Sequence, residues 1–169
     1  MKSAAYRLRP LLGGAALVVL LGAAAPAEDL ALLPDVLGAA QFYGTDPHSG
    51  LALSGRDAVA YHLDDRARPG VGRYEVVWGG MAWRFAREAN RAAFVRTPDL
   101  FAPRFGGYDA GALAEGRLVE TDPDLFLLRS GRLYLFRTEA SRERFRIDPE
   151  VASRAEANWP KLEARLVRG

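Results

Sequence analysis

The chain has 169 residues, with 23 lysines and arginines against 21 aspartates and glutamates, and it contains no cysteine. Without thiols it has no disulfide, no cysteine nucleophile and no thiolate metal site. Its stability must come from a hydrophobic core, and three Trp, eight Phe and six Tyr in a chain of this length suffice for one.

Residues 1–27 have the layout of a secretory signal peptide. Three basic residues precede an uncharged apolar run over residues 11–25, and Ala25 and Ala27 are the small residues that signal peptidase reads. We therefore predict Sec-type export to the periplasm; a retained membrane anchor is the alternative. Cleavage leaves 20 basic and 21 acidic residues in 28–169, interspersed along the chain. This near-neutral balance argues against nucleic acid or a membrane as partner.

The first part of the exported chain carries little pattern. Residues 28–55 are rich in Gly and Pro, which predicts a loop-rich lead-in. Stronger patterns begin at residue 56, so we predict one domain over 56–169. Residues 57–62 are interpreted as a strand, and the polar residues 64–72 as a turn region.

A β-hairpin and a helix follow. Residues 74–78 and 81–85 are aromatic and β-branched, and Gly79 and Gly80 between them suit a two-residue turn in which both residues have positive φ. The apolar spacing then changes and predicts a helix over 87–96.

The hairpin and helix recur 51 residues later. Seven of the 19 residues in 80–98 are identical to those 51 positions further on, which defines an internal repeat at about 73–98 and 124–149. The predicted fold class is α+β, with two related β-hairpin–helix (ββα) units that pack around one core in one small domain and a helical C-terminus. A short helix is expected over 109–116. The last helix, 151–167, is expected in two pieces because Pro160 interrupts it.

Few residues suit catalysis or metal binding. His48 stands in a loop and His62 ends the first predicted strand. A metal needs three or four converging ligands, and two histidines provide them only if carboxylates join. The sequence contains no recognisable nucleophile–base arrangement. We therefore predict a protein that is not an enzyme and has no cofactor, with a metal left as a possibility.

One segment combines several features of a binding site. Gly106 and Gly107 precede a predicted helix, so their backbone N–H groups are available to an anion or polar ligand. Arg104, Tyr108 and Asp109 add a charge, a hydroxyl and a carboxylate. The alternative is that the two glycines only permit a tight chain crossing.

Several motifs together resemble the YHS domain proteins of the exported bacterial type. They are GLALSGRDAVAY (50–61), WRF (83–85), FGGY (105–108), GRLYL (131–135) and ANWP (157–160). The resemblance implies a small α+β fold and heavy-metal binding through cysteines. This chain departs from it, since Ala86, Ala89–Asn90 and Asp109 stand at or near the family's cysteine positions. Metal binding through thiols is therefore not carried over.

The leading functional prediction is a non-enzymatic periplasmic binding or accessory module for a small polar ligand or a protein partner. The predicted ligand-binding residues are His62, Arg104, Gly106, Gly107, Tyr108 and Asp109. The alternative is a metal-handling protein that uses His and Asp in place of Cys. An enzyme with weak acid–base groups is the third hypothesis.

Overall fold

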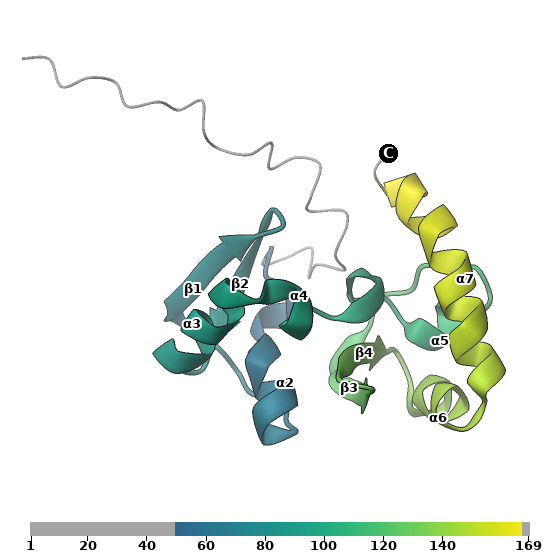
Figure 1. The fold of residues 1–169 in the computed structure, drawn as a ribbon, viewed down its shortest axis with the longest axis horizontal. Coiled ribbons are helices and arrows are strands. Elements are labelled where there is room, and N and C mark those ends of the chain that lie inside the picture. The colour runs from purple at the N-terminus through teal and green to yellow at the C-terminus, as the bar shows by residue number, and fades with distance from the viewer. Residues whose placement is uncertain (1–49, 167–169) are drawn as a thin grey trace, which may run out of the picture. The chain divides into compact units, whose positions relative to one another are not determined.

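The computed structural model describes residues 50–166 (Figure 1). Its elements are η2 (Leu53–Gly55), α2 (Ala58–Asp64), β1 (Val71–Trp78), β2 (Met81–Phe85), α3 (Glu88–Arg96), α4 (Pro98–Phe101), η3 (Arg104–Gly107), α5 (Ala110–Leu113), β3 (Asp122–Arg129), β4 (Arg132–Phe136), α6 (Glu139–Ile147) and α7 (Pro149–Leu166). Helices combined with two antiparallel hairpins confirm the predicted α+β class and the helical C-terminus. The predicted signal peptide, most of the lead-in and His48 lie outside the described residues.

Both predicted hairpins are present. β1 pairs with β2 and β3 pairs with β4, each in antiparallel register and each with an irregularity near the start of its first strand. The first turn has φ values of 57° at Gly79 and 75° at Gly80, and the second has 52° at Ser130 and 70° at Gly131. The Gly-Gly signal therefore predicted the turn correctly, because both central residues need positive φ.

The internal repeat is longer than its sequence signature at 73–98 and 124–149. A 3-10 turn and a short helix precede each hairpin: η2 and α2 before β1, and η3 and α5 before β3. We call residues 51–96 the first repeat and residues 103–147 the second repeat. Each has the order 3-10 turn, short helix, hairpin, helix.

Matching hydrogen bonds support this longer repeat. The N–H of Asp57 donates to the carbonyl of Arg68 (2.8 Å), and the N–H of Asp109 donates to the carbonyl of Val119 (2.9 Å). Donor and acceptor are each displaced by 51 or 52 residues between the repeats. The 3-10 turns match as well, since both contain consecutive residues with positive φ.

The strand predicted at 57–62 is wrong, because this segment forms helix α2. The Asp57 carboxylate accepts hydrogen bonds from the N–H groups of Val59 and Ala60, which starts the helix. A short apolar run does not distinguish a buried strand from a buried helix by its pattern alone. Here the hydrogen bonds to the Asp57 side chain favour the helix over the strand.

The predicted break in the last helix is also wrong. α7 runs through Pro160 without interruption. Val151, Ala155 and Leu162 recur at helical spacing and are buried on one face. This packing offsets the interior proline, which costs a helix about 3 kcal/mol. Neither α7 nor any other helix within 50–166 is long and apolar enough to cross a membrane.

The buried side chains form two clusters, whereas one core was predicted. In the first cluster the β1–β2 hairpin packs against α3, with ring centroids of Trp83 and Phe94 4.9 Å apart. Leu133 and Leu135 of β4 belong to the same cluster. The first repeat therefore uses side chains of the second repeat to complete its core.

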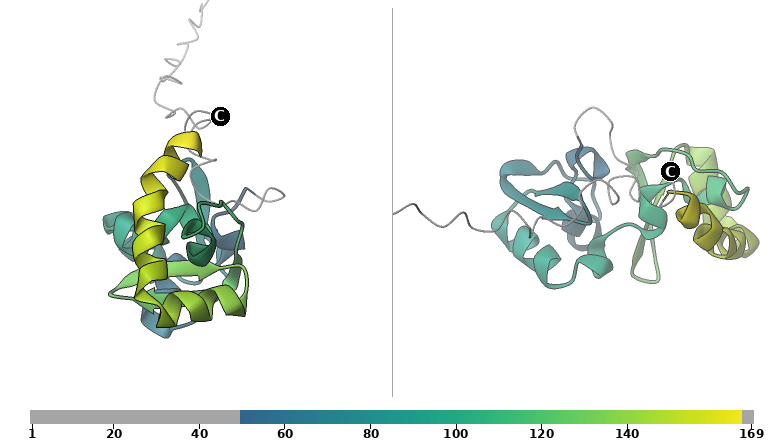
Figure 2. Two further views of the ribbon diagram at one scale, coloured as in Figure 1. Left: turned by 90° about the vertical axis from the view of Figure 1, so that its right-hand side faces the viewer. Right: turned by 90° about the horizontal axis from the view of Figure 1, so that it is seen from above.

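The second cluster lies on the other face of the β3–β4 hairpin. Tyr134 and Phe136, which alternate with the two leucines along β4, pack there against Phe145 of α6. α5 and α7 close this cluster, and α6 contacts α7, crossing near its lower end in the left view of Figure 2. Period-two alternation thus sends neighbouring residues of one strand into two different clusters.

Candidate binding site beside Asp109

Five of the six predicted ligand-binding residues lie together and one lies on another element. Arg104, Gly106 and Gly107 form η3, Tyr108 follows it, and the next residue is the N-cap of α5. His62 is in α2, where its ring packs edge-on against Phe101 with centroids 5.4 Å apart.

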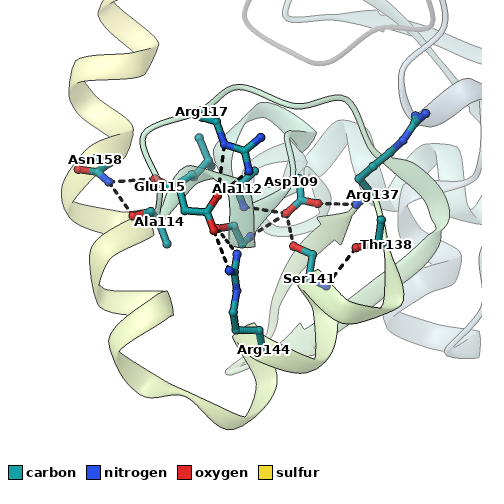
Figure 3. Close-up of polar contacts among 12 residues, drawn as sticks. Asp109, Ala112, Ala114, Glu115, Arg117, Arg137, Thr138, Ser141, Arg144 and Asn158 are labelled. Atoms are coloured by element: carbon teal, nitrogen blue, oxygen red, sulfur yellow. Dashed lines mark hydrogen bonds and ion pairs between the residues drawn. The ribbon is translucent and has the colours of Figure 1, made fainter.

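Asp109 is the most strongly bonded residue of the set (Figure 3). Its side chain is buried, and its Oδ1 accepts hydrogen bonds from the N–H groups of Gly111 (2.8 Å) and Ala112 (2.9 Å). The Ser141 hydroxyl also donates to Oδ1 (2.5 Å), and the N–H of Arg137 donates to Oδ2 (2.7 Å). Both carboxylate oxygens therefore accept hydrogen bonds, and Asp109 links α5, the end of β4 and α6.

The first repeat contains the same arrangement around Asp57. This carboxylate is also buried and accepts from the N–H groups of Val59 and Ala60. The N–H of Ala86 and the side-chain amide of Asn90 donate to its other oxygen, at 2.8 and 2.6 Å. Each repeat thus joins its short helix, its hairpin and its longer helix through one buried aspartate.

A depression of about 400 Å³ lies beside Asp109, between α5 and the start of α6. Its polar lining also includes Glu115, Arg117, Arg137, Thr138, Ser141 and Arg144. Figure 3 shows all of these side chains together with Asp109. Three arginines thus border the depression, and the other ionisable groups that line it within residues 50–166 are Asp109 and Glu115.

Glu115 bridges two of these arginines. Arg117 donates to one of its carboxylate oxygens, and Arg144 donates to the other at 2.7 Å. These hydrogen bonds, first from Arg117 and then from Arg144, lower the pKa of the Glu115 carboxyl below its ordinary value. Arg144 is fixed further by a hydrogen bond of 3.2 Å to the carbonyl of Gly111. Glu115 is therefore ionised at neutral pH and neutralises part of the arginine charge.

The remaining predicted site residues have local roles. Arg104 forms an ion pair with Glu156 of α7 at 2.6 Å and lies over the ring of Phe105. Gly106 and Gly107 are buried with φ of 59° and 80°. Their backbone conformation, which favours glycine, fits the predicted alternative of a tight chain crossing.

Tyr108 and His62 are each partly buried. Burial, and then the charge of Glu120, raise the pKa of the Tyr108 hydroxyl. Burial lowers the pKa of His62, and its Nε2 is enclosed without a hydrogen-bond partner among the described residues. Within residues 50–166 no three His, Asp or Glu side chains are grouped so that they could hold a metal ion.

Sequence reasoning found Asp109 but missed the other polar residues around the depression. Glu115, Arg117 and Arg144 lie in exposed charged segments that carry no motif. A signal was nevertheless available, because Asp-Ala-x-Ala occurs at both 57–60 and 109–112. Aligning these two segments extends the repeat and identifies both aspartates as helix caps.

A scan against protein-family models finds no match for this chain, and searches of the curated proteins and of the solved structures find none either. The resemblance to exported YHS domain proteins therefore stays a prediction, and function must be argued from the site itself.

Proposed function

We propose that this chain is an exported, YHS-like binding module without catalytic activity, which takes a small polar ligand into the depression beside Asp109. The observation that carries the proposal is a hollow of about 400 Å³ bordered by three arginines and a hydroxyl-bearing threonine. Ligand sites are concave and place a few polar groups where they orient the bound molecule.

The chemistry of the lining favours binding over catalysis. The Asp109 carboxylate accepts hydrogen bonds from four donors, three on Oδ1 and one on Oδ2, so it is engaged in holding α5 and α6 in place. The Ser141 hydroxyl donates to that carboxylate, and His62, the histidine within residues 50–166, does not line the depression. Within the described residues Ser141 therefore has no histidine beside it to act as general base, and a serine without such a base is a weak nucleophile.

An NMR screen tests the proposal. Amide spectra of the purified protein are recorded with neutral, zwitterionic, cationic and anionic solutes. We expect at least one class to shift amides of α5 and of the start of α6. Spectra that none of these solutes changes in α5 or α6 would contradict the proposal.

A filled variant provides the control for that screen. In the first repeat Arg87 and Asn90 occupy the positions of Thr138 and Ser141, so Thr138→Arg with Ser141→Asn copies the first repeat into the second. We expect this double variant to lose the ligand-induced shifts. The matched variant Arg84→Gln, on the outer face of the first hairpin, should retain them.

Export is tested separately. We expect the protein recovered from the periplasm to start at Glu28, because Ala25 and Ala27 fit the cleavage site. Replacing Ala27 with a large residue should leave the precursor in the membrane fraction. A wild-type protein that keeps residues 1–27 would support the anchor alternative.

A further inference from the structure

We propose that the depression recognises an oxyanion, a carboxylate or phosphate group on a small solute, and that Glu115 occupies the position of this group in the free protein. This inference rests on the proposed function and specifies its ligand. The bound anion takes the place of the Glu115 carboxylate between the Arg117 and Arg144 guanidinium groups.

The donors around Glu115 have the geometry that such a ligand needs. Arg117 donates to Oε2 of the carboxylate through both Nε and Nη2, and Arg144 donates to Oε1 through Nη1. Each oxygen therefore faces one guanidinium group, and guanidinium groups donate strong, charge-assisted hydrogen bonds to the oxygens of carboxylates and phosphates. Arg144 keeps its position without Glu115, because its Nη2 donates to the carbonyl of Gly111.

The ion pairs that Glu115 forms with Arg117 and Arg144 are weak enough for a solute anion to replace them. The side chains of Glu115, Arg117 and Arg144 are 41%, 61% and 46% exposed. Ion pairs at such exposed positions add little to the stability of a protein. A solute anion that contacts both arginines therefore needs little binding energy to displace Glu115 into solvent.

In the first repeat the carboxylate equivalent to Glu115 is held too firmly for a solute anion to displace it. Asp64 aligns with Glu115 and also lies between two arginines, Arg68 at 2.6 Å and Arg87 at 3.6 Å. Its side chain is only 21% exposed. Arg87 donates in addition to Asn90, at 2.8 Å, which ties it into the network around the buried aspartate.

The second repeat lacks the side chains that enclose Asp64 in the first repeat. Thr138 and Ser141 stand where the first repeat has Arg87 and Asn90, and both are shorter. Ser141 reaches the buried carboxylate because Gly111, directly opposite, has no side chain. The shorter side chains leave the depression open and Glu115 exposed at its rim.

The test is calorimetric titration of the purified protein with inorganic phosphate and with succinate at low ionic strength. Glu115→Gln removes the internal anion and keeps the side-chain shape, so we expect both probes to bind about tenfold more tightly, as removal of one competing charge allows. Asp64→Asn, the matched change in the first repeat, should leave both dissociation constants unchanged. Arg144→Gln should weaken binding at least about tenfold.

The outcomes separate the two proposals. Equal affinity of wild type and Glu115→Gln, or anion binding that Arg144→Gln leaves intact, overturns the inference. If only neutral or cationic solutes shift the amides of α5 and α6, the inference fails and the binding function stands. If no solute of any class does so, the binding function itself fails. Urea unfolding curves of each variant show whether it remains folded.

Discussion

The two hairpins have the same register and the same turn but differ in what covers them. β1–β2 buries Trp83 and Phe85 on one face, while Arg84 on the other face forms an ion pair with Glu75 at 2.8 Å. β3–β4 buries both faces, and Leu135 stands where the first hairpin has Arg84. The first hairpin therefore has one solvent-exposed face, whereas the second lies between two clusters. The difference depends on whether every second residue of the return strand is polar or apolar.

The same contrast extends to the sites beside the buried aspartates. Around Asp57 the longer side chains Arg87 and Asn90 bond to each other and to their neighbours. Around Asp109 the shorter Thr138 and Ser141 border a depression. The buried aspartate and its hydrogen bonds are thus common to both repeats, whereas the side chains beside it differ in length.

The largest expected effect comes from the two buried aspartates. Asp57→Ala and Asp109→Ala each leave four donors without their acceptor, and we expect each to lower the free energy of unfolding by about 3–5 kcal/mol. Urea unfolding with m-values measures both. If one variant loses less than about 1 kcal/mol, the two aspartates do not have equivalent roles.

A pair of substitutions tests the difference between the hairpins. Leu135→Ala creates a cavity in the first cluster, and we expect it to cost about 2–5 kcal/mol. Arg84→Ala at the aligned position breaks an exposed ion pair and should cost less than about 1 kcal/mol. Similar losses in the two variants would show that the outer faces of the hairpins do not differ as described.

The smallest effect concerns pH and the first repeat alone. Burial lowers the pKa of His62, so the unfolded chain takes up a proton at higher pH than the folded protein. Stability should therefore fall as the pH drops through about 6.5, the ordinary histidine value. His62→Gln should reduce this dependence, whereas a loss of stability that persists in full would contradict it. His48→Gln serves as the control, and the second repeat has Ala114 at the position of His62.

The sequence predicted the features that depend on local signals. Gly79 and Gly80 specified a turn by their conformational freedom, and the alternation around Trp83 specified the return strand. Helix α2 was missed because its apolar run fits a strand equally well, and only the bonds to Asp57 decide. The passage of α7 through Pro160 depends on packing against the second cluster, which the sequence does not display.

The candidate site was predictable only in part. Asp109 was identified as a polar group beside paired glycines, but its bonding to Ser141 joins elements 32 residues apart. The depression results from the sizes of side chains on three elements, and its arginines resemble ordinary surface charge in the sequence. Such a site is recognised only when the side chains around the buried aspartates of the two repeats are compared in the structure.

A crystal structure of the purified protein grown with inorganic phosphate would show directly whether an anion replaces Glu115. We predict phosphate between the guanidinium groups of Arg117 and Arg144, with the Glu115 carboxylate turned out to solvent and Asp64 still paired with Arg68. A structure in which Glu115 still bridges both arginines while phosphate binds elsewhere would contradict it.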